Sequence, residues 1–347
     1  MKAAIFKKVG HPLSIEDVAM PEPASGELLL KVEACGVCAS DTHAAAVPGY
    51  LQDGTILGHE FVGEVVAIGP GVSGWQIGQR ATAMPHASCG QCEACAKGEF
   101  QRCRNLRYLG FTLDTAGAYA QFVRVRADCS VPVGKTVSTR DAAMIEPLAV
   151  GYDTARRARI TPEDSVLIAG AGPIGLTIAL WARHLGAADV VVSDLVDARL
   201  DVARQVGASA VINPQREERV SAAFERATGK AAPDVIIEAV GAPGMIQHCI
   251  DIAGYGTRIA VVGVCMHPDT FKPATAIRKA VELIFCMGYD RADWIDIISL
   301  LERKVIDPSP IVTAQIGFDE FPDRFEALKL PGSDLKVLLT PDMPAGT

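Results

Sequence analysis

The sequence lacks the features that would place it in a membrane or on a polyanion. No run of about 20 uninterrupted apolar residues occurs in its 347 residues, which argues against a transmembrane helix. The opening stretch, Met1-Lys-Ala-Ala-Ile-Phe-Lys-Lys, has no long apolar segment of the kind found in secretory signals. The net charge of −8 provides no basic excess for nucleic acid or anionic lipid. We therefore expect a cytoplasmic protein that binds neither nucleic acid nor membrane.

Internal repeats and low-complexity segments are also missing, so the chain is expected to fold into ordinary globular domains. Its length suffices for two domains, each with its own core. Cysteine, by contrast, is plentiful, with ten residues. In a long chain without a secretory signal, cysteines more often bind metal or lie buried as thiols than form disulfides.

Four of the cysteines are closely spaced, in the pattern C-x2-C-x2-C-x7-C, and they are Cys89, Cys92, Cys95 and Cys103. Four soft ligands suit a closed tetrahedral zinc site. An iron–sulfur cluster is the alternative, but its motifs usually place the fourth cysteine after a short gap and before proline. We therefore predict a structural zinc in a lobe of about residues 86–106. A closed site has no open coordination position, so its role is to hold a loop in place.

A second group of chemically active side chains precedes this lobe. Five such residues fall within nine positions, namely Cys35, Cys38, Ser40, Asp41 and His43. His59 and Glu60 follow at the start of a strand-like run, so ligands from separate loops can converge on one metal. Glu146 stands alone in an apolar, helix-like stretch, where a buried carboxylate is costly unless it pairs or binds metal. The alternative is a partly exposed glutamate at a helix end.

The stretch Ala169–Leu176 carries the pattern GxGxxG between a predicted strand and a predicted helix. Gly170 permits a tight turn, Gly172 allows the backbone to approach a pyrophosphate, and Gly175 allows close packing of helix and strand. A second strand ends in Asp194, where this fold requires an acid for the ribose hydroxyls. The combination favours dinucleotide binding over a glycine turn in some other α/β unit.

The periodicity changes along the chain. The first 35 residues alternate short apolar runs with turns, which indicates a β-rich opening domain. After Gly151, strands and helices alternate as successive βα units, which predicts an α/β fold with a parallel sheet covered on both faces. Residues 315–339 return to a mixed β pattern that we expect to rejoin the first domain.

Taken together and in this order, these motifs resemble the zinc-dependent medium-chain alcohol dehydrogenase family over essentially the whole chain. The resemblance implies a GroES-like β-rich catalytic domain at residues 1–150 and 288–347. It also implies a Rossmann domain with a doubly wound parallel sheet at residues 151–287. Substrate, zinc and nicotinamide are expected to meet in the cleft between the two domains.

The resemblance also implies roles for the residues of the catalytic zinc site, the second zinc of each chain. Its expected protein ligands are Cys38, His59, Glu60 and Glu146, and direct or water-mediated ligation by Glu146 is left open. Cys35 is expected to be a structural thiol, and Asp41 to pair with a base. The remaining cysteines are expected to be small buried apolar residues, namely Cys129, Cys249, Cys265 and Cys286. Ser40 resembles the hydroxyl that accepts the proton of the alcohol, and His43 the histidine that relays it to solvent. For His43 the alternative is a surface histidine in a loop.

The cofactor implied by the resemblance is NAD, because Asp194 repels a 2′-phosphate, although Arg199 weakens the preference over NADP. Val262 and Val264 match positions against the nicotinamide, and Lys336 matches a basic residue that reaches the pyrophosphate. The remaining cofactor contacts lie in the glycine turn, at Gly170, Gly172, Pro173, Ile174 and Gly175.

The expected substrate is a hydrophobic secondary alcohol, oxidised to its ketone. The acid at Glu146 matches the polyol, threonine and secondary-alcohol branches, but Ala39, Ala44–Ala46 and Leu51 offer few polar groups to a polyol. A polyol or threonine dehydrogenase is the first alternative, and a non-catalytic nucleotide-binding sensor the second. The length is similar to that of bacterial tetrameric members, so we expect a homo-oligomer, either a tetramer or a dimer.

Overall fold

The computed structural model describes residues 1–217 and 219–343, and these divide into two compact units. The first unit contains residues 1–146, 290–305 and the chain from 312 onward. The second contains residues 147–289 and the short segment 306–311. The crossings near 146 and 289 lie within a few residues of the domain boundaries expected from the sequence. No helix of the described residues is long and apolar enough to cross a membrane.

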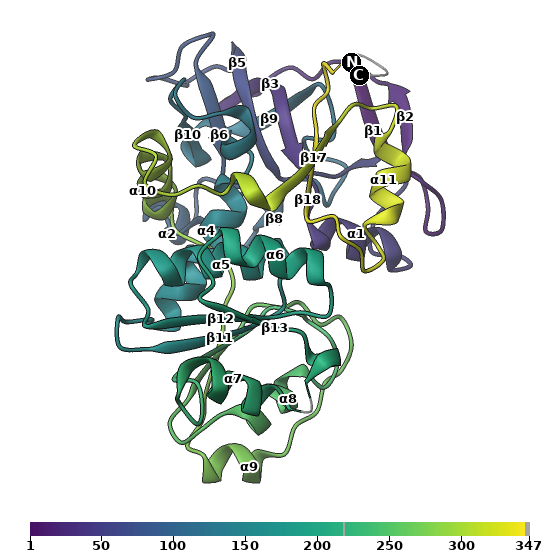
Figure 1. Cartoon of the computed structure of the whole chain (residues 1–347). Coiled ribbons are helices and arrows are strands. Elements are labelled where there is room, and N and C mark those ends of the chain that lie inside the picture. Colours follow the sequence, from purple (N-terminus) through teal and green to yellow (C-terminus); the bar gives the residue numbers. More distant parts are fainter. Residues whose placement is uncertain (218, 344–347) are drawn as a thin grey trace. The chain divides into compact units, whose positions relative to one another are not determined.

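The first unit is built on a seven-stranded sheet that joins the two ends of the chain (Figure 1). Its central strand, β3 (Glu27–Gly36), pairs antiparallel with β5 (Glu60–Ile68), and the register places Gly36 opposite Glu60. The C-terminal strand β18 (Lys336–Leu339) pairs with the same end of β3. The other members are β6 (Arg80–Ala83), β9 (Phe122–Arg126), β10 (Ser130–Pro132) and β17 (Val312–Ile316).

Smaller elements complete this unit. A three-stranded sheet contains β1 (Lys2–Phe6), β2 (Ser14–Asp17) and β4 (Thr55–Ile56). The pair β7 (His86–Ala87) and β8 (Arg107–Tyr108) closes the base of the four-cysteine lobe, which contains α2 (Glu93–Ala96) and η1 (Phe100–Arg102). The remaining helices are α1 (Ala39–Ala46), η2 (Ala127–Cys129), α3 (Thr139–Ala142), α10 (Arg291–Glu302) and α11 (Phe321–Ala327).

The mixed β pattern expected at residues 315–339 contains a helix that the sequence did not indicate, α11. Phe321 and Phe325 stand four residues apart, so they lie on one face of a helix, and both are fully buried. They pack edge-on against the ring of Tyr119. A tertiary contact of this kind decides the structure of a short segment whose own pattern is ambiguous.

The second unit is a six-stranded parallel sheet in the order β13-β12-β11-β14-β15-β16. The strands are β11 (Ser165–Ala169), β12 (Asp189–Ser193), β13 (Ala210–Ile212), β14 (Val235–Glu238), β15 (Arg258–Val261) and β16 (Glu282–Phe285). The strand order reverses beside β11, as in the doubly wound folds that bind dinucleotides at this point. The predicted Rossmann domain is confirmed.

Helices cover both faces of this sheet. In Figure 1, α5 (Pro173–His184) and α6 (Asp197–Gln205) lie on one side, and α7 (Val220–Thr228) and α8 (Met245–Ile252) on the other. The central strands β11 and β14 are fully buried and consist of Val, Ile, Leu and Ala apart from one terminal polar residue each, Ser165 and Glu238, which suits strands covered on both faces. The remaining helices are α4 (Ile145–Arg157), η3 (Pro214–Arg216), α9 (Pro273–Arg278) and η4 (Ser309–Ile311).

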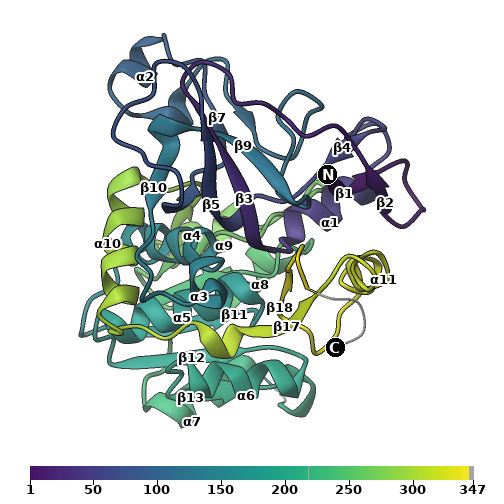
Figure 2. The same cartoon turned by 90° about the horizontal axis from the view of Figure 1, so that it is seen from above.

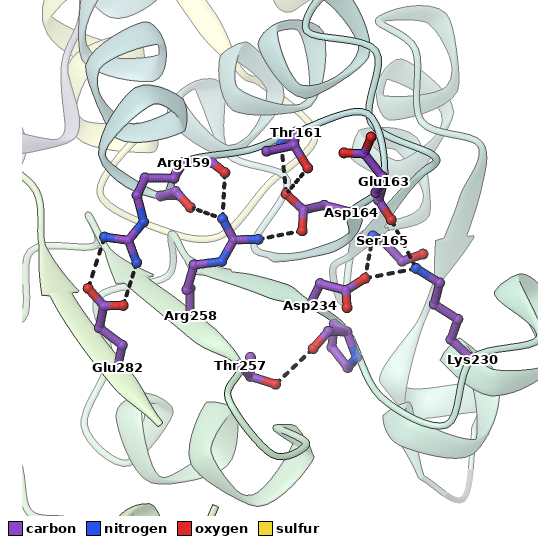
Figure 3. A network of polar contacts seen from close by, with 12 residues as sticks. Arg159, Thr161, Glu163, Asp164, Ser165, Lys230, Asp234, Thr257, Arg258 and Glu282 are labelled. Carbon is purple, nitrogen blue, oxygen red and sulfur yellow. Dashed lines mark hydrogen bonds and ion pairs between the residues drawn. The ribbon is translucent and has the colours of Figure 1, made fainter. Parts of the chain in front are cut away.

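Charged side chains connect the amino ends of these strands (Figure 3). The guanidinium of Arg258, at the start of β15, pairs with Asp164, and it also donates to the carbonyl oxygen of Ala158 over 2.9 Å. Asp234 accepts hydrogen bonds from Lys230 Nζ at 2.9 Å and from the backbone of Ser165 at 2.8 Å. The network therefore holds the amino ends of the strands together, and the carboxyl ends remain available for ligands.

Candidate metal centres and dinucleotide site

Three potential ligands for a metal gather in the first unit. Cys38, His59 and Glu60 each offer one donor atom, and these atoms lie within 4.8 Å of one another. Cys38 is the N-cap residue of α1, and Glu60 begins β5. Because Gly36 and Glu60 are opposite each other in the sheet, the end of β3 leads directly to the cluster. The sheet register thus brings together two motifs that the sequence separates.

Asp41 fixes the orientation of the His59 ring. The Asp41 Oδ1 lies 3.2 Å from His59 Nδ1, which leaves Nε2 as the ring nitrogen for a metal. Burial lowers the pKa of His59, but Asp41 and the Cys38 sulfur oppose this effect, so that the pKa is well above its usual value. Burial raises the pKa of Asp41, and contacts with His59, Tyr119 and Cys38 outweigh it and lower the pKa. Asp41 is therefore a carboxylate that holds an imidazole.

Glu60 is fully buried and is held by a lysine from the far end of the chain. Lys336 Nζ donates to Glu60 Oε2 over 2.5 Å and to the carbonyl oxygen of Val37 over 2.8 Å. Burial lowers the pKa of Lys336, but Glu60 and Cys38 raise it more, so the ammonium stays charged. A Cβ atom on Gly36 would lie 2.4 Å from Glu60 Oε2, so a glycine is needed beside this pair. The expected contact between Lys336 and a pyrophosphate stays a prediction.

The cluster fits a zinc ion. A thiolate, an imidazole and a carboxylate are typical zinc ligands, and three protein ligands leave an open position for substrate. Glu60 Oε1 is buried without a hydrogen-bond partner among the described residues, as expected for an atom that awaits a cation. Glu146 begins the first turn of α4, and its charge contributes to the raised pKa of Lys336, so it lies near the cluster. It is outside the gathered group of three, and ligation by Glu146 stays a prediction.

Other residues of the predicted site lie around this group. Cys35 is fully buried, and burial raises the pKa of its thiol well above the usual value, so it remains a neutral thiol. Ser40 and His43 occupy the first and second turns of α1, three positions apart on one helix face. Ser40 is half-buried and His43 is exposed. Their proton relay stays a prediction.

The four cysteines of the lobe form a second candidate metal site. The donor atoms of Cys89, Cys92, Cys95 and Cys103 lie within 4.8 Å of one another. The backbone N–H of Cys95 lowers the pKa of Cys92 to about 6, which favours the thiolate that a metal requires. All ten cysteines, which lie in the described ranges, are free of disulfides. The set suits the closed tetrahedral zinc site predicted from the spacing.

Other cysteines were expected to be buried, and the structure agrees for two of four. Cys129 and Cys249 are buried, whereas Cys265 and Cys286 are half-exposed. Cys265 and Cys286 follow the carboxyl ends of strands β15 and β16, where the chain leaves the sheet. The expectation of burial was therefore wrong for these two.

Two aromatic residues beside the candidate metal cluster of Cys38, His59 and Glu60 were not predicted from the sequence. The Phe111 ring packs on the His59 ring, with 5.6 Å between the centroids. The hydroxyl of Tyr119 donates to Asp41 Oδ2 over 2.5 Å. Both residues come from the segment between β8 and β9, whose local pattern contains no chemical motif, so no sequence signal indicated their position.

The glycine turn of the second unit joins β11 to α5 at the carboxyl edge of the sheet. Gly170 has φ +103°, which favours glycine, and a Cβ on Gly175 would lie 1.9 Å from the Gly170 carbonyl oxygen. A Cβ on Gly172 would meet nothing within 4 Å, so open space lies in front of the helix N-terminus. Pro173 is the first residue of α5, and Ile174 follows it. This arrangement suits a pyrophosphate on the helix dipole.

The other predicted cofactor residues follow neighbouring strands at the same edge. Asp194 comes directly after β12, and its carboxylate accepts from the Ala171 N–H over 2.7 Å and from the Val196 N–H over 2.9 Å. The acid thereby holds the glycine turn in place. Val262 follows β15 directly, and Val264, two residues on, is exposed. Arg199 lies half-buried on α6.

Comparison with known proteins matches both parts of the chain to protein families. Residues 24–135 match the model of the alcohol dehydrogenase GroES-like domain, and residues 173–303 match that of the zinc-binding dehydrogenase. The chain is 30% identical to the sorbitol dehydrogenase of Bacillus subtilis (strain 168), over 99% of this chain and 98% of that protein. It is 32% identical to the L-threonine 3-dehydrogenase of Pyrococcus horikoshii, over 95% of each.

Solved structures show the same likeness. An alcohol dehydrogenase from Escherichia coli CFT073, complexed with NADH, is similar with a TM-score of 0.87 and 29% identity, over 98% of this chain and 99% of that one. A zinc-binding dehydrogenase from Sinorhizobium meliloti 1021, bound to NADP, gives a TM-score of 0.88 and 28% identity over the same shares. The matches extend over both units and both metal clusters. The chain belongs to the zinc-dependent medium-chain alcohol dehydrogenase family and is a dehydrogenase.

Proposed function

We propose that the protein oxidises a hydrophobic secondary alcohol to its ketone and passes the hydride to NAD. The dehydrogenase class follows from the family, and the contact between Phe111 and His59 supports the substrate. Phe111 would thus present an apolar ring beside the metal position that His59 helps to form. An apolar wall favours a hydrocarbon substituent and offers no hydrogen bond to a second hydroxyl.

The side chains around the cluster would have different roles in this reaction. A zinc ion held by Cys38, His59 and Glu60 supplies Lewis acidity, which lowers the pKa of an alcohol. Asp41 keeps Nε2 of His59 directed at the metal position. The Ser40 hydroxyl accepts the alcohol proton, and His43, one helical turn further along α1, passes it to solvent. The ring of Phe111 excludes water from one side of the site.

NAD is proposed as the hydride acceptor because of Asp194. A carboxylate at the end of β12 accepts hydrogen bonds from ribose hydroxyls and repels a 2′-phosphate. The structural relatives bind NADH in one case and NADP in the other, so they do not decide the matter. We further propose two zinc ions per chain, one in the cluster at Cys38 and one in the four-cysteine lobe. Metal analysis before and after treatment with a chelator tests this stoichiometry.

We propose a homo-oligomer, a dimer or a tetramer, in the cytoplasm. Strand β16 is at the edge of the parallel sheet, and the apolar side chains of Phe285 and Met287 are mostly exposed there. An unpaired edge with apolar side chains favours association. Free thiols at all ten cysteines suit a reducing compartment. Light scattering on the purified protein measures the mass, and a monomer would contradict the proposal.

A polyol or threonine dehydrogenase is the second candidate, and the named relatives favour it. The test is the rate of NADH formation with 1-phenylethanol, cyclohexanol, sorbitol and L-threonine, each with NAD and with NADP. We expect the highest kcat/KM with an apolar secondary alcohol and NAD. A higher kcat/KM with sorbitol or threonine would overturn the proposed substrate but leave the dehydrogenase class intact.

A further inference from the structure

The geometry points to Tyr119 as a positioning residue that orients the zinc ligand His59 through Asp41, with α11 holding the Tyr119 ring in place. The inference rests on the proposed catalytic zinc site. Tyr119 itself touches neither the metal position nor a substrate, so its effect on the metal is indirect.

Asp41 is fully buried, and two hydrogen-bond donors and one ion-pair contact surround its carboxylate. Oδ1 faces His59 Nδ1 at 3.2 Å, and Oδ2 accepts from the Cys38 N–H at 3.2 Å and from the Tyr119 hydroxyl at 2.5 Å. The Tyr119 hydroxyl is also 3.3 Å from the Gly36 carbonyl oxygen, but a hydroxyl has one proton, and the shorter contact receives it. Tyr119 therefore makes the shortest of the three contacts, and it fixes the plane of the carboxylate that faces the imidazole.

The hydroxyl is suited to this task because it remains a donor. A phenol hydroxyl carries one proton, and here it is donated to the Asp41 carboxylate over 2.5 Å. A hydrogen bond from a neutral donor to a buried carboxylate is stronger than one between neutral groups. This bond therefore holds the Asp41 carboxylate in place beside the His59 ring.

The Tyr119 ring is clamped on several sides, so the position of its hydroxyl is well defined. A Cβ on Gly58 would lie 2.5 Å from the Tyr119 ring, which means that the ring packs on the backbone directly before His59. The rings of Phe321 and Phe325 meet it edge-on, with centroids at 4.8 and 6.2 Å. Its backbone N–H donates to the Leu57 carbonyl oxygen over 2.9 Å. Packing of α11 is therefore transmitted to the metal ligand through one side chain.

The alternative is that Tyr119 only fills space in the core. The variant Tyr119→Phe separates the two roles, because it keeps the ring and removes the hydroxyl. In the zinc-loaded full-length enzyme we expect the catalytic zinc to pass to a chelator about 10-fold or more faster, as for other partners of metal ligands. The zinc of the four-cysteine lobe should be lost at the wild-type rate, which provides an internal control.

A cobalt spectrum and a control variant distinguish the proposed role from a general loss of structure. With cobalt in the catalytic site, Tyr119→Phe should shift the visible absorption bands, which report the arrangement of the ligands. The matched control is Tyr108→Phe, which removes a tyrosine hydroxyl beside His86 in the same unit and should leave both readouts unchanged. An unaltered cobalt spectrum together with an unaltered rate of zinc loss would overturn the inference.

If Tyr119→Phe weakens both zinc sites alike, a double-mutant cycle with Asp41 distinguishes an effect through Asp41 from a general loss of structure. In an Asp41→Asn background the tyrosine hydroxyl has no carboxylate to hold, so Tyr119→Phe should cause little further loss of catalytic zinc. Additive effects of the two substitutions would contradict a path through Asp41. The wild-type enzyme tests the underlying site separately: a chain that binds only the lobe zinc would refute the proposed metal centre and, with it, the inference, whereas a wild-type chain with both zincs limits a negative result to the role of Tyr119.

Discussion

The buried ammonium of Lys336 lies 2.5 Å from Oε2 of Glu60, although the two residues are 276 positions apart in the chain. Both side chains are almost completely shielded from solvent. Figure 2 shows why they meet, since β18 lies beside β3 in the first unit, as their pairing requires. The pair neutralises one oxygen of Glu60 and leaves the other for a cation.

Removal of the Lys336 charge should destabilise the first unit. In the variant Lys336→Met, Glu60 would be left as a buried carboxylate without a partner, which typically costs about 3–5 kcal/mol. Denaturant unfolding of the metal-free protein measures the loss. The matched control is Lys97→Met, because Lys97 pairs with Glu93 on the surface and should contribute about 1 kcal/mol or less. Equal effects of the two substitutions would show that the buried pair has no special role.

Substitutions at two glycines of the turn should affect different properties, NAD affinity at Gly172 and folding stability at Gly175. Gly172 has φ −69° and open space around a Cβ, so Gly172→Ala should leave the free energy of unfolding nearly unchanged. The added methyl group would occupy the space proposed for the pyrophosphate, and we expect at least a 10-fold loss of NAD affinity by fluorescence titration. Gly175→Ala is the contrasting variant, because its Cβ would lie 1.9 Å from a carbonyl oxygen, and it should destabilise the fold. Unchanged NAD affinity in Gly172→Ala would place the cofactor elsewhere.

The Phe111 ring should set the preference for apolar alcohols. With Phe111→Ala we expect kcat/KM for 1-phenylethanol to fall about 10-fold or more, since apolar contacts of this size are worth about 1–3 kcal/mol. The rate with sorbitol should change much less, so the ratio of the two is the decisive quantity. Leu113→Ala removes an exposed apolar side chain from the same loop and serves as control. A parallel loss on both substrates would assign Phe111 to the support of His59 and not to specificity.

His86 should make the folding stability depend on pH. Burial lowers the pKa of His86 to about 4, whereas an unfolded histidine titrates near 6.5. The unfolded chain therefore binds more protons between these values, so the contribution is complete above about pH 6.5 and is lost as pH falls toward about 4. Between pH 7 and 5 this amounts to about 2 kcal/mol.

The measurement for His86 is urea unfolding at pH 5 and at pH 7. The variant His86→Leu should show a smaller difference between the two pH values than the wild type. His11→Leu, which replaces an exposed histidine, should keep the wild-type difference. If His86→Leu retains the full pH dependence, other groups are responsible for it.

Local motifs explain which parts of the site were predictable. The spacing of the four cysteines and the GxGxxG turn between strand and helix are short patterns, and their chemistry depends on residues close in sequence. Cys38 and His59 were also found from such patterns, supported by the resemblance to a family. The parallel sheet was predicted from aliphatic runs in the sequence, since strands that are covered on both faces have nearly continuous apolar sequences.

Contacts between residues that are far apart in the chain could not be predicted from such local patterns. Nothing near Tyr119 indicates a hydrogen bond to Asp41, which is 78 positions away, and nothing near Lys336 indicates Glu60. The helix α11 was missed for the same reason, because its two phenylalanines are explained by the ring they contact and not by a helical repeat. These features depend on tertiary packing, which overrides local preference in short segments.

The position of β18 also sets an order of events during synthesis. The six strands of the parallel sheet are complete once Phe285 has been made, whereas Lys336 and its strand β18 follow later in the chain. Domains generally fold as units while the chain emerges. The unit with the parallel sheet can therefore fold on the ribosome before Lys336, which carries the counter-charge of Glu60, has been made. Final assembly of the candidate metal site therefore requires a strand that is made after the six strands of the parallel sheet.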